Sequence, residues 1–75
     1  MVDWEILDST GKYLGRSGTT SAATAFCRCM GILGTRVDET EIQPTKLDDG
    51  LYQITYSGRQ FFASDAARPR PKLGN

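Results

Sequence analysis

Residues 21–33 of this 75-residue chain, SAATAFCRCMGIL, carry its clearest structural pattern. Its apolar residues recur at the spacing of one helix face, at Ala22, Ala25, Phe26, Cys29, Met30 and Leu33. Hydroxyl residues fill positions 19–21, and any of the three is suited to cap the helix N-terminus. Either Gly31 or Gly34 is suited to end the helix, because glycine readily adopts the left-handed conformation found there. We therefore predict one amphipathic helix whose apolar face packs on a sheet.

A β-hairpin is expected before the helix. Residues 2–7 alternate between apolar and acidic side chains, which is the period of a strand with one buried face. The turn sequence Asp8-Ser9-Thr10-Gly11 follows, and residues 12–17 are expected to return as a shorter second strand.

The segment after the helix is rich in β-branched residues, and residues 35–42 are expected to form a strand. Val37 and Ile42 are an odd number of residues apart, so in a regular strand they would point to opposite faces. A bulge or a partly exposed edge strand would reconcile the two. Pro44 is expected to end the strand, because proline cannot donate to a central ladder. Residues 46–50 then read as a turn.

A second hairpin is expected near the C-terminus, with strands at residues 51–56 and 59–63 joined by Ser57-Gly58. Its register places Ile54 opposite Phe61, and we expect that face to pack on the helix. The opposite face is mixed, with Leu51, Gln53, Thr55, Gln60 and Phe62.

The order strand, strand, helix, strand, strand, strand predicts an α+β fold. We expect a mainly antiparallel sheet of four to five strands with one helix packed on one face. Residues 1–63 are expected to form this single domain, and residues 64–75 a flexible, basic tail that contains two prolines. Because a core this small is marginal, burial against a partner or in a homodimer would add to its stability.

The composition narrows the function classes. Nine Lys and Arg residues balance nine Asp and Glu residues, which argues against a strongly basic nucleic-acid binder and against an acidic mimic of DNA. Histidine is absent, which removes the commonest general base and the commonest metal ligand. The carboxylate pairs Asp38-Glu39 and Asp48-Asp49 fit a solvated edge and a turn. We therefore expect no enzyme activity, no metal and no cofactor.

The cysteines indicate a reducing compartment. Cys27 and Cys29 point about 200° apart around a helix, so they are not placed to form a disulfide. We expect reduced thiols that pack as small apolar residues in a cytoplasmic protein, and keep a thiol redox role as an alternative. Residues 1–7 lack the pattern of a signal peptide, and residues 22–33 are too short to span a membrane.

Two binding functions remain. The first is docking on a larger protein or nucleoprotein complex, with contact residues expected to be exposed: Arg59, Phe62, Arg68, Arg70 and Lys72. The second is direct binding of RNA or single-stranded DNA by the last hairpin and the basic tail. Aromatic residues on that hairpin, together with Arg59, are the components of a base-stacking platform: Tyr52, Tyr56, Phe61 and Phe62.

The layout also resembles that of small anti-CRISPR proteins from phages and mobile elements. The shared features are a short N-terminal β segment, a helix begun by Ser and Thr that carries a cysteine, and a β-rich C-terminal half. They correspond here to Thr19-Thr20-Ser21-Ala22-Ala23 and to the strand start Gly50-Leu51-Tyr52, within residues 1–63. The resemblance implies a non-enzymatic inhibitor that binds a Cas effector complex or nuclease and blocks DNA binding or nuclease recruitment. The neutral charge departs from the acidic members that mimic DNA.

Overall fold

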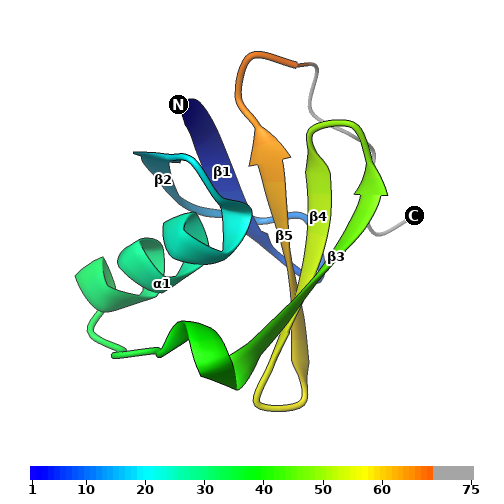
Figure 1. The fold of residues 1–75 in the computed structure, drawn as a ribbon. Coiled ribbons are helices and arrows are strands. Elements are labelled where there is room, and N and C mark those ends of the chain that lie inside the picture. Colours follow the sequence, from blue (N-terminus) through cyan, green and yellow to red (C-terminus); the bar gives the residue numbers. More distant parts are fainter. Residues whose placement is uncertain (69–75) are drawn as a thin grey trace.

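The computed structural model describes residues 1–68, in which five strands form one antiparallel sheet with a helix on one face (Figure 1). The helix is α1 (Ala22–Ile32). The strands are β1 (Val2–Asp8), β2 (Tyr13–Thr19), β3 (Ile42–Asp48), β4 (Leu51–Tyr56) and β5 (Arg59–Asp65). Their order across the sheet is β2-β1-β5-β4-β3, and every pair is antiparallel. The predicted α+β fold is confirmed.

The ends of α1 follow from its local sequence. Ser21 is the N-cap, and its Oγ accepts a hydrogen bond of 3.4 Å from the Thr24 amide. At the other end Gly34 adopts φ +99°, and the next amide, of Thr35, donates to Met30 O at 2.8 Å. This is a Schellman ending, so Gly34 ends the helix and Gly31 lies within its last turn.

Both predicted hairpins are confirmed. In the first, β2 begins at Tyr13 and runs to Thr19, which makes it longer than expected. In the second, Ser57 and Gly58 have φ values of 52° and 74°, the left-handed pair that a two-residue hairpin turn requires. Ile54 pairs with Phe61 as predicted.

The segment after the helix differs from the expectation. Residues 35–38 form no strand, and Glu39–Glu41 form a short 3-10 helix, η1. Asp38 caps it, because Asp38 Oδ1 accepts from the Thr40 amide at 2.9 Å and Glu41 Oε1 accepts from the Asp38 amide at 3.0 Å. Local side-chain hydrogen bonds thus offer this segment an alternative to strand pairing.

Strand β3 begins at Ile42, where the sequence suggested an end, and continues through Pro44 to Asp48. Pro44 is tolerated because, within residues 1–68, β3 is an edge strand whose one pairing partner is β4. The turn expected at residues 46–50 is correspondingly shorter, and Leu47 falls in a register shift between Lys46 and Asp48.

The core lies between α1 and the sheet face that we call the inner face. Its centre is Phe26, whose ring centroid lies 4.9 Å from that of Phe61 and 6.0 Å from that of Tyr56. The face that carries Ile54 and Phe61 therefore packs on the helix, as expected. Leu7 is fully buried on the opposite, outer face, where it pairs with Phe62. The alternating pattern of β1 did not predict this second buried position.

The chain stays paired beyond Ala63. Strand β5 continues to Asp65, and the Ala66 amide donates to Asp3 O at 2.8 Å. The tail expected from residue 64 therefore begins as strand, and most of it, residues 69–75, lies outside the described residues.

Candidate functional site

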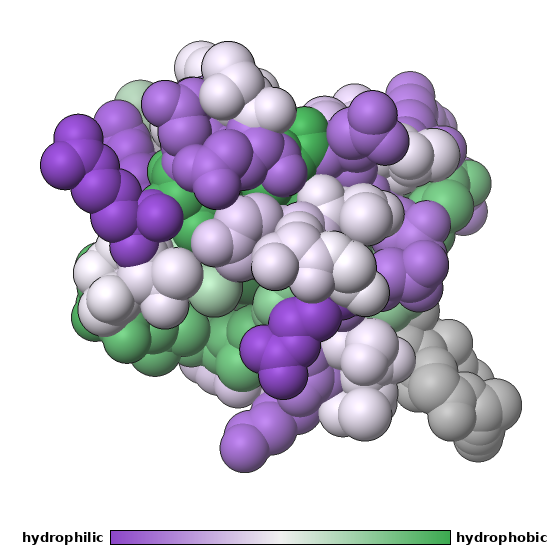
Figure 2. All heavy atoms as spheres, turned by 90° about the horizontal axis from the view of Figure 1, so that it is seen from below, coloured by the Kyte–Doolittle hydropathy of each residue, from purple (hydrophilic) through white to green (hydrophobic). Residues whose placement is uncertain are grey.

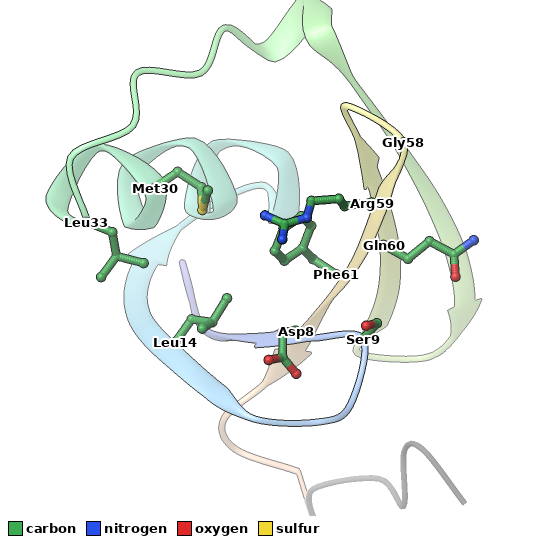
Figure 3. A pocket seen from close by; sticks show the side chains of 9 residues that line it. All are labelled: Asp8, Ser9, Leu14, Met30, Leu33, Gly58, Arg59, Gln60 and Phe61. Atoms are coloured by element: carbon green, nitrogen blue, oxygen red, sulfur yellow. The ribbon is translucent and has the colours of Figure 1, made fainter.

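An open pocket of about 640 Å³ lies where the β1–β2 and β4–β5 turns meet the C-terminal end of α1 (Figure 3). We call it the Arg59 pocket. It is lined by Asp8, Ser9, Leu14, Met30, Leu33, Gly58, Arg59, Gln60 and Phe61. Figure 3 shows the side chains of Arg59 and Phe61 projecting from β5 into the centre of the pocket, whereas the Gln60 side chain points away from the pocket.

The apolar part of the pocket comes from three elements. Phe61 of β5 lies at the base and is nearly buried, Leu14 comes from β2, and Met30 comes from the last turn of α1. Leu33, the C-cap of the helix, is 55% exposed at the rim, and the adjacent Ile32 is 81% exposed. Figure 2 shows hydrophobic surface gathered on the helix side of this face, next to strongly hydrophilic side chains.

Among the described residues that line the pocket, Arg59 is the one cation. It is exposed, and it makes no side-chain hydrogen bond or ion pair with residues 1–68. Arg16 differs in this respect, because its Nη2 lies 2.8 Å from Asp3 Oδ2 across the β1–β2 pair. The charge of Arg59 is therefore available to a bound molecule.

Asp8 supplies the negative charge of the pocket. Its Oδ1 accepts three hydrogen bonds within its own turn, from the Thr10 hydroxyl at 2.6 Å, the Thr10 amide at 2.9 Å and the Lys12 amide at 2.9 Å. These bonds, the Thr10 hydroxyl first among them, hold the pKa of Asp8 below its usual value of 3.8. Asp8 is therefore ionised at neutral pH and forms no ion pair with Arg59.

Strand alternation places these two charges on one face. Asp8 pairs with Phe61, and Arg59 is two residues before Phe61 on β5, so all three belong to the inner face. Neighbours on this diagonal have Cα atoms about 7–8 Å apart. The pocket thus holds an anion and a cation at its mouth above an apolar base.

Of the contact residues predicted from the sequence, the three that the structure describes do not form one surface. Arg59 begins β5, whereas Arg68 follows its other end. Arg68 Nε lies 3.8 Å from Asp65 Oδ2, and its side chain packs so closely over Gly50 that a Cβ there would lie 2.6 Å from Arg68 Cδ. Phe62 is half-buried on the outer face. The remaining two, Arg70 and Lys72, lie outside the described residues.

Sequence reasoning missed the apolar side of the pocket. Met30 and Leu33 continue the apolar stripe of α1, so they were expected in the core, but the sheet does not reach far enough to cover Leu33. Ile32 was the available signal, because this large apolar residue falls outside the stripe at the very end of the helix.

Three of the four aromatics expected to form a base-stacking platform pack on the inner face. The Tyr52 ring centroid lies 5.6 Å from that of Trp4, and Tyr56 and Phe61 contact Phe26. Only Phe62 faces the other side of the sheet. Within residues 1–68 the last hairpin therefore presents no row of exposed rings.

The two cysteines are free and differ in their surroundings. Cys29 is buried against the sheet, and burial raises the pKa of its thiol. Cys27 is half-buried, and its thiol pKa is raised by burial and then by the acidic residues of η1 and its cap, Glu39 foremost. Neither environment favours a reactive thiolate.

No three His, Cys, Asp or Glu side chains in residues 1–68 gather closely enough to hold a metal ion. No helix in that part of the chain is long and apolar enough to cross a membrane. Comparison with family models, curated proteins and solved structures gives no significant match.

Proposed function

We propose that this protein is a small, non-enzymatic binding protein that docks on a larger cytoplasmic protein or nucleoprotein complex. We further propose that docking inhibits that target, in the manner of the anti-CRISPR proteins whose layout the sequence resembles. The observation that supports the proposal is the Arg59 pocket, in which exposed apolar side chains at the end of α1 flank an arginine that has no ion-pair partner within residues 1–68.

Apolar exposure at this place favours a protein partner. Leu33 and Ile32 leave most of their surface in water, and burial of one such side chain is worth about 1.5–3 kcal/mol. Arginine is one of the residue types that contribute most to binding energy at protein interfaces, above all where the partner excludes water from a pocket around it. The Arg59 pocket combines both features on neighbouring elements.

Electrostatics favours a protein over a nucleic acid at this surface. Residues 1–68 contain two more acidic than basic side chains, and Asp8 lies in the pocket itself. A polyanion requires several cations close together, because phosphate contacts supply most of its affinity. RNA or single-stranded DNA is therefore the alternative partner, and nuclease treatment distinguishes it from a protein.

The experiment is affinity capture from a host lysate with three baits, run with and without nuclease. The baits are the wild-type chain, Leu33→Glu and the matched control Leu47→Glu. Leu47 is 49% exposed, similar to Leu33, but it lies in the β3 register shift and does not line the pocket. The proposal predicts a protein that resists nuclease and is lost only with Leu33→Glu. Capture that depends on nucleic acid, or equal capture by all three baits, would contradict it.

A further inference from the structure

We propose that the Arg59 pocket binds an exposed internal segment of the partner protein in which one acidic residue adjoins a large apolar residue. This inference rests on the proposed function and names the chemistry that the pocket selects. The acidic side chain pairs with the Arg59 guanidinium, and the apolar side chain enters the pocket beside Phe61, on the side lined by Leu14 and Met30.

The size and lining of the pocket fit a large side chain. Its volume of about 640 Å³ lies within the range of about 300–1,000 Å³ that ligand sites occupy. Leu14, Met30 and Phe61 provide apolar contact on three sides, and Leu33 at the rim covers what enters. An aromatic or long aliphatic side chain would bury all four.

The charge of Arg59 selects an acidic neighbour for that side chain. The guanidinium is exposed and unpaired within the described residues, so a carboxylate reaches it without breaking an existing ion pair. Its planar fork of N–H groups matches a carboxylate with two parallel hydrogen bonds, a geometry that lysine cannot reproduce.

Asp8 limits the number of acidic residues that the site accepts. Its Oδ1 is engaged by Thr10 and Lys12, whereas its Oδ2 receives no hydrogen bond from residues 1–68. That oxygen is free to accept from a peptide N–H of the bound segment. A second carboxylate, or a run of phosphates, would instead meet the Asp8 charge, so the site favours a single acidic residue.

The test uses the full-length protein labelled with ¹⁵N and two blocked peptides, Ac-Ser-Glu-Phe-Ser-NH2 and its Gln counterpart, Ac-Ser-Gln-Phe-Ser-NH2. The inference predicts amide shifts around Gly58, Gln60 and Leu33, and binding of the Glu peptide roughly three- to tenfold tighter than the Gln peptide at low salt. A third peptide, Ac-Glu-Glu-Phe-Ser-NH2, is expected to bind no more tightly than the first.

Two variants locate the effect. Arg59→Gln removes the preference for the Glu peptide, whereas Arg28→Gln retains it, because Arg28 is an exposed arginine of α1 that does not line the pocket. Equal binding of the Glu and Gln peptides to the wild-type protein, shifts confined to another surface, or no shifts at millimolar peptide would each overturn the inference.

Failure of this inference is distinct from failure of the proposed function. A protein partner captured by the wild-type chain and lost with Leu33→Glu, but held equally by Arg59→Gln, leaves the docking surface in place and removes the acidic preference. Absence of any protein partner that resists nuclease removes the proposed function itself.

Discussion

Gly15 of β2 lies so close to Cys29 of α1 that a Cβ on Gly15 would stand 2.5 Å from Cys29 Sγ. Gly15 does not have a positive φ, so this position requires glycine for its missing side chain and not for an unusual backbone conformation. Cys29 is 2% exposed and fills that space. This contact fixes how closely α1 approaches β2, and thereby sets one wall of the Arg59 pocket, through Leu14 and Met30 on the same two elements.

Gly15→Ala is therefore expected to lower the free energy of unfolding by about 1–3 kcal/mol, as overpacking of a core does. The measurement is urea denaturation followed by circular dichroism. Cys29→Ala in the same chain should recover part of the loss, because it removes the atom that the new methyl group meets. The double variant thus loses less stability than the two single variants added together.

Gly31→Ala is the matched control for Gly15→Ala. A Cβ at Gly31 meets nothing within 4 Å, and Gly31 lies inside the last turn of α1. The alanine should raise the free energy of unfolding by about 0.5–1 kcal/mol, because it favours the helix. Equal destabilisation by the Gly15 and Gly31 substitutions would contradict the close approach of α1 to β2.

The turn around Asp8 predicts a dependence of stability on pH. The folded pKa of Asp8 lies below 3.8, so the folded state binds fewer protons than the unfolded state as the pH falls toward that value. The stabilisation is fully present above the unfolded pKa of 3.8 and is lost as the pH drops through the folded pKa. Asp38 has a lowered pKa for the same reason, its bonds from Thr40, and contributes in the same direction.

Urea denaturation at pH 7 and pH 3 checks this prediction, together with a carboxyl titration by NMR. Asp8→Asn should lose less stability between the two pH values than the wild-type protein does. A pKa for Asp8 above 3.8, or an unchanged pH dependence in the variant, would contradict the three hydrogen bonds to Oδ1.

The cysteines predict slow thiol chemistry. Burial raises the pKa of both thiols, and Cys29 is more buried than Cys27, so iodoacetamide at pH 7.5 should modify Cys27 first and both slowly. Mass spectrometry over time measures the order. The Cys27→Ser/Cys29→Ser variant should still capture the partner. Loss of capture in a variant that remains folded would favour the redox alternative.

The elements that could be predicted from the sequence are those that depend on a local residue pattern. The stripe of α1 and the two tight turns could be found because helix period and turn residues are read over a few positions. The strand predicted at residues 35–42 was wrong, because its β-branched residues were given more weight than a helix-capping signal in the same segment. Asp38 and Glu41 have the spacing of a capping box, and that is what they form.

The candidate site was less accessible to sequence reasoning. Arg59 was correctly expected to be exposed, but its neighbours come from three distant elements, and their meeting depends on the strand order. The pairing of β1 with β5 brings Asp8 beside Phe61, and no local pattern encodes that pair. The length of β5 places Arg59 and Arg68 at opposite ends of the strand, although the sequence analysis groups them on one surface.

Docking at the Arg59 pocket is tested by measuring the affinity of the purified partner for the wild-type protein, Leu33→Glu and Leu47→Glu. We expect Leu33→Glu to weaken binding by about thirtyfold or more, as loss of a dominant interface residue does, and Leu47→Glu to leave the affinity within about twofold of wild type. Binding that is unaffected by Leu33→Glu, or lost equally with Leu47→Glu, would show that the partner docks elsewhere than at the Arg59 pocket.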